Sequence, residues 1–315
     1  MKALITGIAG FVGSHLAELL VGKNYEVFGT CLACESLENI QSLKKKIALD
    51  ECDIKDFDQL SKLVKNILPD QIYHLAAFSS VGKSFEKPLK ALEVNLQGTL
   101  NLLEILRNSK RKVKLLLVGS ADVYGKVEKK DLPIKETLPL NPISPYGASK
   151  ACADILAYQY FNSYGVNVIR VRSFNHTGPR QAKGFVIPDF ASQIAQIEKG
   201  YAKPFIKVGN TEAERDISDV RDIVNGYYLL MKKGKPGEAY NLCSGNSYKI
   251  KYLLEYLLNL SEKEIKVVTS QNRKRPTDIP ILLGDNSKIK KEVGWKPKIP
   301  IIKTLKDTLD FWRGR

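Results

Sequence analysis

The sequence predicts an α/β fold built on a doubly wound parallel sheet. Three observations support it. A glycine-rich segment at residues 7–13 separates a strand pattern from a helix pattern, strand and helix patterns alternate to about residue 175, and polar residues follow the ends of the predicted strands. Beyond residue 175 the strict alternation is lost. We therefore expect a Rossmann sheet and a smaller, interlaced C-terminal α/β region that binds the substrate.

Composition sets the protein class. The 315 residues are 43% hydrophobic and carry a formal charge of +15, with lysines spread along the chain and interleaved with acidic residues. A nucleic-acid interface would instead be clustered, so we expect no nucleic-acid partner. No apolar run approaches the ~18 residues of a membrane span, and the chain opens directly on a strand pattern. We expect a soluble cytoplasmic protein with no membrane partner.

Five cysteines and three histidines are scattered through the chain. Cys31 and Cys34 have C-x-x-C spacing, but no second pair lies at metal-site spacing. We expect reduced structural thiols and no metal site. A redox or zinc site is the alternative interpretation of the C-x-x-C pair.

The first strand, residues 2–6, leads into a G-x-x-G-x-x-G segment and then a helix at residues 14–21. Glycine is needed where the backbone turns tightly and approaches a diphosphate, whose charge favours a helix N-terminus. His15, inside this helix, is expected to pack against its neighbours and to take no part in the chemistry. The expected cofactor-binding residues here are Gly7, Gly10, Phe11, Val12 and Gly13.

The second strand, residues 25–30, is followed by Cys31 and Leu32. An NAD enzyme usually has an acid at this place and an NADP enzyme an arginine, so the choice between NADP and NAD stays undecided. A short third strand ends near Asp53 and Ile54, both expected to contact the cofactor. Asp53 could accept a hydrogen bond from the adenine amino group or cap the helix at residues 56–68.

The fourth strand, residues 71–75, ends in small residues that allow close approach to a cofactor, and Leu75, Ala76 and Ala77 are expected to contact it. A helix is predicted at residues 88–107, with Asn95 on a largely apolar face. A buried asparagine needs partners, and we expect it to bridge backbone. A buried strand at residues 113–118 then leads to Ser120.

Tyr146 and Lys150 are four residues apart in a helix that Ser144 can cap and whose first turn suits Pro145. They therefore share a helical face. A neighbouring ammonium favours the phenolate, so we expect Lys150 to lower the pKa of Tyr146 toward neutrality. Such a tyrosine can exchange a proton with an alcohol or ketone oxygen, which the Ser120 hydroxyl can hold. A surface tyrosine and a solvated lysine are the alternative.

The remaining elements complete the predicted domains. The helix ends near residue 164, Gly165 stops it, and a strand follows at residues 166–171. Residues 1–175 are expected to bind NAD(P), together with about 216–243, and residues 176–315 mainly to bind the substrate. The later predictions are helices at 189–199, from 218, at 249–258 and at 302–312, and strands at 205–208 and 238–242.

Further motifs are spread over essentially the whole chain. They occupy residues 120–125, 174–179, 184–190, 208–210, 215–216, 219–220, 240–245, 275–278 and 294–297. With the glycine segment and the Tyr-x-x-x-Lys pair, the chain resembles the extended short-chain dehydrogenase/reductases, the NAD-dependent epimerase/dehydratase family that acts on nucleotide sugars. Within it, the sequence is most similar to GDP-4-keto-6-deoxy-D-mannose reductases, which make GDP-D-rhamnose, and lies near GDP-mannose 4,6-dehydratases.

Some residues distinguish the relatives. Dehydratases usually have threonine at the place of Ser120, glutamate at Asp122 and paired arginines after the second strand, none of which occurs here. Arg180 departs from the reductase pattern, because similar reductases often have glycine there, and in this respect the chain resembles the dehydratases. UDP-sugar 4-epimerases share the residues around Ser120 but carry the NAD-binding acid that Cys31 replaces. Dehydratase, epimerase and a cofactor-sensing binding protein without chemistry are therefore the alternatives to a reductase.

The resemblance implies roles for individual residues. Hydride passes from the cofactor to C4 of the keto sugar, Tyr146 protonates O4, Ser120 bonds that oxygen, and Lys150 holds the nicotinamide ribose. Asp122 binds the sugar, or is simply a capping residue. An acid at residue 278 suits the donors of guanine N1 and N2. A homodimer through helices near 90–107 and 150–164 is also implied. The implied substrate-binding residues are Asn175, Val186, Arg215, Arg275 and Asp278.

Overall fold

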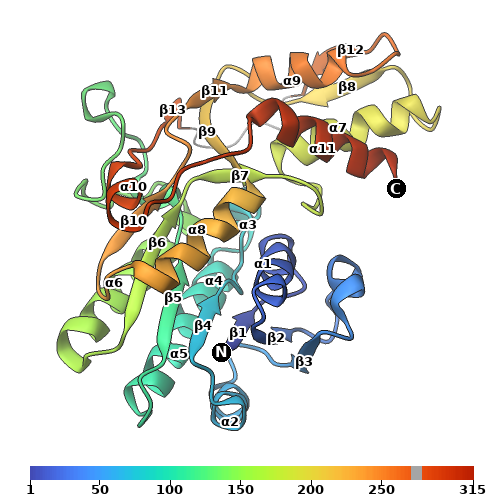
Figure 1. Ribbon diagram of the computed structural model, residues 1–315. Helices are drawn as coiled ribbons and strands as arrows, with labels where there is room; N and C mark the ends of the chain where they lie inside the picture. Colours follow the sequence, from blue (N-terminus) through green and yellow to red (C-terminus); the bar gives the residue numbers. More distant parts are fainter. Residues whose placement is uncertain (271–278) are drawn as a thin grey trace.

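A seven-stranded sheet forms the centre of the structure, a computed structural model that describes residues 1–270 and 279–315 (Figure 1). The strands are β1 (Lys2–Thr6), β2 (Glu26–Cys31), β3 (Ile47–Glu51), β4 (Gln71–His74), β5 (Lys114–Val118), β6 (Val168–Ser173) and β10 (Ala239–Leu242). Their order is β10-β6-β5-β4-β1-β2-β3, and all neighbours pair in parallel. The prediction of a doubly wound parallel sheet is confirmed.

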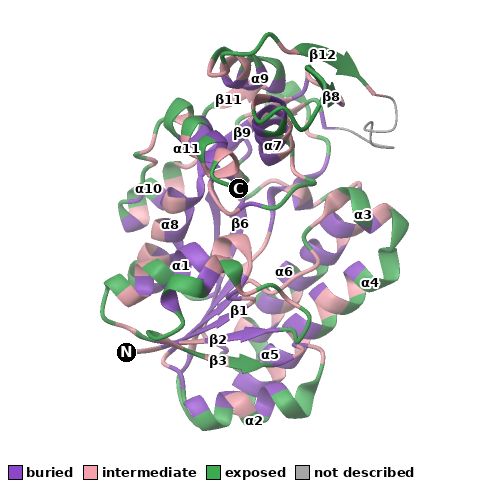
Figure 2. Cartoon of the chain, turned by 90° about the vertical axis from the view of Figure 1, so that its right-hand side faces the viewer, coloured by how far each residue is buried: buried purple, intermediate pink, exposed green. Residues whose placement is uncertain are grey.

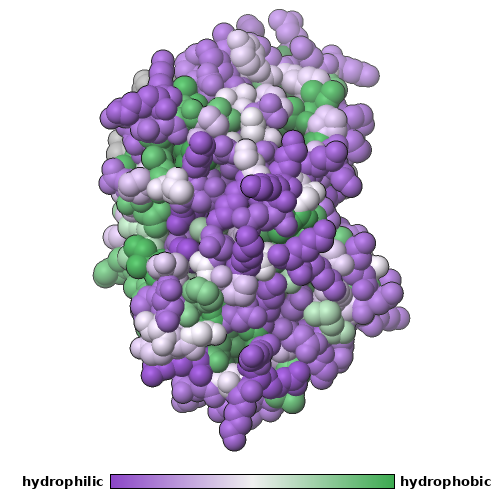
Figure 3. Space-filling model, turned by 60° about the vertical axis from the view of Figure 1, so that its left-hand side comes forward, coloured by the Kyte–Doolittle hydropathy of each residue, from purple (hydrophilic) through white to green (hydrophobic). Residues whose placement is uncertain are grey.

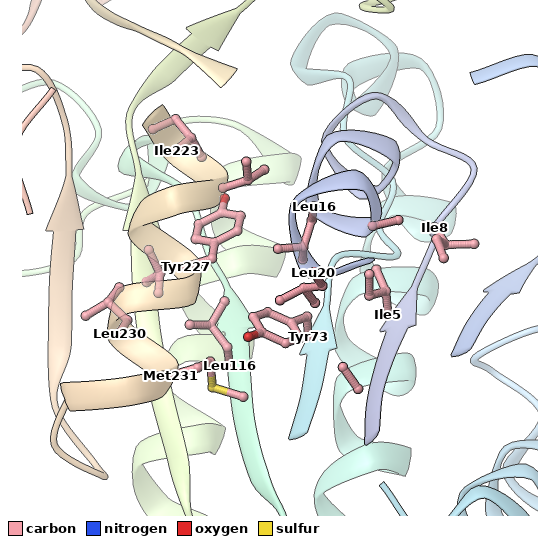
Figure 4. Packing of buried hydrophobic residues seen from close by; sticks show 14 of the residues in the cluster. Ile5, Ile8, Leu16, Leu20, Tyr73, Leu116, Ile223, Tyr227, Leu230 and Met231 are labelled. Atoms are coloured by element: carbon pink, nitrogen blue, oxygen red, sulfur yellow. The ribbon is translucent and has the colours of Figure 1, made fainter. Parts of the chain in front are cut away.

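Helices cover both faces of this sheet. On one face lie α1 (Phe11–Gly22) and α8 (Val220–Lys233), and on the other α2 (Phe57–Ile67), α5 (Gly98–Arg107) and α6 (Pro145–Tyr164). Figure 4 shows the first of these layers, where Leu16 and Leu20 of α1 and Tyr227 of α8 pack toward Tyr73 and Leu116 of the sheet. Burial on both faces explains the nearly continuous apolar strands.

A smaller region is stacked on the carboxyl ends of the strands (Figure 1). Its own apolar cluster joins three helices to two short sheets. The helices are α7 (Val186–Glu198), α9 (Ile250–Asn259) and α11 (Ile301–Arg313). The strands are β7 (Asn175–Thr177), β9 (Glu214–Asp219), β11 (Ser247–Lys249) and β13 (Ile281–Leu282) in one sheet, and β8 (Phe205–Val208) and β12 (Lys266–Thr269) in the other.

Local sequence signals set the ends of α6. The Ser144 side chain accepts from the N–H of Gly147 at 3.0 Å, and Pro145 occupies the first turn. Gly165 ends the helix at φ +68°, a conformation that favours glycine. Midway, buried Asp154 holds α6 against β6 through Arg170 at 2.6 Å and Arg172 at 3.1 Å. This ion-pair cluster fixes the helix that carries Tyr146.

Two predicted helices and one predicted helix cap need correction. The helix predicted at 88–107 is α4 (Pro88–Leu92), a π-helical turn at Glu93–Gln97, and α5, so it is interrupted at Asn95. The helix predicted from Ser218 begins at Val220, because residues 214–219 pair with three other strands as β9. The cap of α2 is Asp56, which accepts from the N–H of Gln59 at 2.9 Å, so the capping role considered for Asp53 is wrong.

Burial separates the core from the surface as the composition suggests. The sheet strands are largely buried and the outer helix faces are exposed (Figure 2). On the face in Figure 3, hydrophilic side chains predominate and hydrophobic ones occur in small groups. Over residues 1–270 and 279–315, no helix combines the length and apolarity needed to cross a membrane. The same residues hold no cluster of three or more possible metal ligands.

Candidate active site

Ser120 and Tyr146 meet at the carboxyl end of β5. Ser120 follows that strand and caps a 3₁₀ turn, Ala121–Tyr124. Its hydroxyl accepts from the N–H of Asp122 at 3.1 Å and donates to an Asp122 carboxylate oxygen at 3.0 Å. The Tyr146 hydroxyl is hydrogen-bonded to Ser120 as well. The structure therefore brings three of the four predicted catalytic side chains into one contact group.

Lys150 lies one turn along α6 from Tyr146. It is 7% exposed, and its ammonium donates to the carbonyl of Val118 at 2.9 Å. Burial lowers the pKa of Lys150 to about 8. The lysine is thus fixed against β5 and still mainly charged at neutral pH.

The expected acidification of Tyr146 is wrong for the structure without a bound cofactor. Burial raises the pKa of the Tyr146 phenol, the Asp122 carboxylate adds to the increase, and the hydrogen bond with Ser120 opposes it only in part. Desolvation by burial, which disfavours the phenolate, is the largest of these contributions to the Tyr146 pKa. Tyr146 is therefore protonated at neutral pH and ready to donate a proton.

The glycine segment between β1 and α1 forms a close-fitting cradle. Gly7 has φ +69°, and a Cβ there would lie 3.0 Å from the Cα of Ala76. A Cβ on Gly13 would lie 2.3 Å from the carbonyl oxygen of Gly7. Gly10, the N-cap of α1, supplies no side-chain bond to the first-turn N–H groups. This backbone fits the diphosphate of a nicotinamide dinucleotide, which takes its hydrogen bonds from such N–H groups.

The other predicted cofactor contacts lie along the same edge of the sheet. Ile54 is buried, and its carbonyl accepts from Asn101 at 3.0 Å. Asp53 is partly exposed and accepts from the N–H of Lys55 at 3.0 Å. Leu75, Ala76 and Ala77 follow β4 and are partly buried. Phe11 and Val12, at the start of α1, are also partly buried.

A series of hydrogen-bonded, buried polar side chains starts beside the glycine segment. Sequence reasoning missed this series. The Thr6 hydroxyl accepts from the N–H groups of the two residues after His74, each at 3.1 Å, and so donates to His74 Nδ1 at 2.8 Å. The opposite ring nitrogen then carries hydrogen and faces the Thr99 hydroxyl at 3.3 Å, which donates to the carbonyl of Asn95 at 2.7 Å. Burial lowers the pKa of His74 to about 3, so the ring stays neutral.

Asn95 continues this series to the helix of Tyr146. Its amide accepts from the N–H of Phe78 at 2.7 Å and donates to the Phe78 carbonyl at 3.1 Å. It also donates to the Ser149 hydroxyl at 2.8 Å, which in turn donates to the carbonyl of Tyr146 at 2.7 Å. The backbone-bridging role expected for Asn95 is confirmed. The sequence signal for the whole hydrogen-bonded series was the presence of polar residues within otherwise apolar segments.

Three of the implied substrate residues lie in the smaller region. Asn175, on β7, is exposed, and Val186 begins α7 with 36% of its surface exposed. Arg215, on β9, donates to the carbonyls of Glu214 at 2.9 Å and Ile279 at 2.6 Å. Arg275 and Asp278 lie outside the described residues.

His15 is packed, as expected. Its Nε2 lies 2.9 Å from the carbonyl oxygen of Pro179, and burial lowers its pKa. The ring meets Phe11 edge-on, and Phe11 stacks on His176 at 6.1 Å between ring centroids. These rings join α1 to the segment that enters the smaller region.

Comparison with known proteins places this arrangement in a family. The sequence model of the GDP-mannose 4,6 dehydratase family matches residues 4–308. The chain belongs to this family. The resemblance drawn from the motifs is thereby confirmed.

Relatives match along the full chain. It is 34% identical over 314 residues to the GDP-6-deoxy-D-mannose reductase of Pseudomonas aeruginosa, covering 100% of this chain and 98% of that protein. It is 33% identical over 326 residues to GDP-mannose 4,6 dehydratase 2 of Arabidopsis thaliana, covering 98% and 86%. Both of these relatives are named as enzymes of GDP-sugar chemistry.

Solved structures share the fold. RMD from Pseudomonas aeruginosa, complexed with NADPH, has a TM-score of 0.86 at 33% identity and covers 100% of this chain and 99% of its own. UDP-glucose 4-epimerase of Thermotoga maritima, with UDP-glucose, has a TM-score of 0.88 at 28% identity, with coverage of 100% and 99%. Reductase and epimerase relatives therefore have nearly the same backbone, so fold alone does not separate their reactions.

Proposed function

We propose that this chain is an NAD(P)H-dependent reductase that converts the C4 ketone of GDP-4-keto-6-deoxy-D-mannose to the alcohol of GDP-D-rhamnose. The observation that carries the proposal is the buried, protonated Tyr146 bonded to Ser120 at the edge of the sheet that also carries the glycine cradle. A reductase needs its tyrosine protonated before turnover. The full-length match to a GDP-6-deoxy-D-mannose reductase supports the choice of substrate.

Each residue of the site has a role in this reaction. A bound nicotinamide dinucleotide supplies hydride, and the diphosphate would lie against the glycine cradle. Ser120 holds the substrate carbonyl oxygen, and Tyr146 donates its proton to that oxygen as negative charge develops there. The charge of Lys150, held by the Val118 carbonyl, then stabilises the phenolate left on Tyr146.

A GDP-mannose 4,6-dehydratase is the second candidate. The carboxylate of Asp122, in contact with Ser120, is the observation that favours it, because a dehydratase needs an acid near the sugar to remove the C5 proton. UDP-sugar 4-epimerase is a third reaction compatible with the same fold. Both recycle the cofactor internally, whereas a reductase consumes it. A cofactor-sensing binding protein would neither recycle nor consume the cofactor.

Incubation with GDP-mannose separates these functions. The protein is given GDP-mannose alone, then GDP-mannose with a separate dehydratase and NADH or NADPH, and the sugars are identified by mass and NMR. We expect a 6-deoxyhexose nucleotide only in the second mixture, with one reduced cofactor consumed per product. Product from GDP-mannose alone would instead identify a dehydratase.

The two regions of the chain would bind different partners in this reaction. We propose that residues 1–175, with about 216–243, bind the cofactor and that residues 176–315 mainly bind the nucleotide sugar. Asn175, Val186 and Arg215 would contact it there. Exchange of Arg215 for Gln should raise KM for the GDP sugar while leaving dissociation of the reduced cofactor unchanged, because a guanidinium grips phosphate and an amide does not.

A homodimer completes the proposal. Cys152, Ile155 and Tyr158 lie at three-residue intervals on α6 and are exposed, with Ile155 at 57% and Tyr158 at 50%. An apolar stripe of this kind supports pairing of two copies through α6 and α5. Sedimentation analysis of the native chain and an Ile155→Glu variant tests it, with dimer and monomer expected. A cytoplasmic location accords with five free cysteine thiols.

A further inference from the structure

The backbone N–H of Tyr146 is bonded to a side chain from another element. The first N–H groups of an α-helix have no acceptor within the helix. In α6, Pro145 has no N–H, and the N–H of Gly147 donates to the Ser144 hydroxyl at 3.0 Å. The N–H of Tyr146 donates instead to the hydroxyl of Ser84, 62 residues earlier in the chain, at 3.2 Å. The proposed proton donor is thus anchored through its backbone to a second helix.

Ser84 is itself held in one orientation. It lies in α3 (Val81–Glu86), a short helix that contacts α6 and is capped by Ser80. The serine is completely buried, and its hydroxyl donates to the carbonyl of Val81 at 2.7 Å. Because the hydroxyl hydrogen points at that carbonyl, the oxygen presents its lone pairs to the N–H of Tyr146. The acceptor for this N–H is therefore fixed by the fold of α3.

Two further contacts constrain the same stretch of backbone. The carbonyl of Tyr146 accepts from Ser149, whose hydroxyl accepts from the amide of Asn95 in the π-helical turn. A Cβ on Gly147 would lie 2.7 Å from the carbonyl oxygen of Asp122, so the 3₁₀ turn after β5 lies directly against the first turn of α6. With its N–H, its carbonyl and its neighbour all in contact, the backbone of Tyr146 has little freedom to move.

We propose that Ser84 is a positioning residue for the proton transfer. By holding the N–H of Tyr146, it fixes the backbone from which the phenol extends, and so keeps the phenol in contact with Ser120. Ser84 acts through this backbone and not on the substrate. A misplacement of about 1 Å can slow a reaction about 10²-fold. The inference rests on the proposed function, in which Tyr146 protonates the keto sugar.

A spectroscopic measurement tests the position of the phenol without turnover. Tyrosine labelled with carbon-13 at Cζ gives an NMR resonance for Tyr146, identified by its loss in Tyr146→Phe, and its shift reports the hydrogen bonding of the phenol oxygen. Ser84→Ala removes the acceptor and should move this resonance. Ser192→Ala is the matched control and should not, because Ser192 is a buried helical serine of α7 that also donates to the carbonyl three residues earlier, at 3.2 Å.

Kinetics supply the second readout, at a temperature where circular dichroism shows every variant folded. Ser84→Ala should lower kcat about 10–100-fold. The KM for the keto sugar and the dissociation constant of the reduced cofactor should stay close to native, because neither binding site loses a contact. The solvent isotope effect on kcat should rise, because a poorly placed phenol transfers its proton more slowly. Ser192→Ala should leave all four quantities close to native.

The outcomes separate this inference from the proposed function. A Ser84→Ala enzyme with native kcat, or with an unmoved Tyr146 resonance, overturns the inference and leaves the reductase assignment intact. Equal falls of kcat in Ser84→Ala and Ser192→Ala also overturn it, because the loss of any buried serine would then suffice. If the native chain reduces no keto sugar, the proposed function fails, and the resonance alone decides whether Ser84 positions Tyr146.

Discussion

Replacing Tyr146 with phenylalanine removes one hydroxyl from a buried ring and should leave the fold intact. Positioned proton transfer contributes about 10²–10⁴-fold to a rate. Because burial raises the pKa of Tyr146, the phenol is a weak acid, and a weak acid contributes toward the lower part of that range. We therefore expect kcat to fall about 10²–10³-fold, equivalent to roughly 3–4 kcal/mol of transition-state free energy.

The assay follows oxidation of NADH or NADPH at 340 nm with the keto sugar generated in place by a dehydratase. Tyr73→Phe is the control, since Tyr73 is also fully buried and its hydroxyl donates to Gln71 at 3.0 Å, away from Ser120. Its kcat should stay within about threefold of native, because the lost hydrogen bond contributes only to stability. Equal losses in the two variants, or a Tyr146→Phe enzyme of native kcat, would refute the assignment of the proton donor.

Three further predictions concern charge and packing. The kcat/KM should fall above pH 8, where Lys150 loses its proton. The free energy of unfolding should instead rise from about pH 8 to 10.5, because in this range the unfolded chain binds more protons than the folded one. Gly13→Ala should lose about 1–3 kcal/mol in urea unfolding, because its Cβ would overlap the Gly7 carbonyl, while Gly22→Ala, with open space around it, should not lose stability. Asp154→Asn should lose about 3–5 kcal/mol in the same measurement, because the buried Arg172 and the partly buried Arg170 of β6 lose their carboxylate.

Local signals predicted most of the first domain. The pattern of Ser144, Pro145 and Gly165 predicted both ends of α6, because capping depends on neighbouring residues alone. Glycine spacing predicted the loop before α1 for a similar reason. By contrast, β9 was missed, since its mostly charged residues form a strand only through pairing with β7, β11 and β13, which are distant in sequence.

The site showed the same limit. Ser120, Tyr146 and Lys150 were predicted as a group from strand ends and helix spacing; the structure joins Ser120 to Tyr146 and holds Lys150 one helical turn away against β5. The sign of the Tyr146 pKa shift was not predictable in this way, because it depends on how completely the surrounding chain excludes water.

Strand β10 has a consequence for synthesis of the chain. It seals the edge of β6, yet it is made about 70 residues later, after most of the strand-and-helix pattern is complete. A nascent chain released to residue 180 exposes that open edge and the apolar surface on which α8 will pack. Residues 220–242 must therefore be synthesised before the seven-stranded sheet and its helical layer are complete, and fragments ending earlier should aggregate.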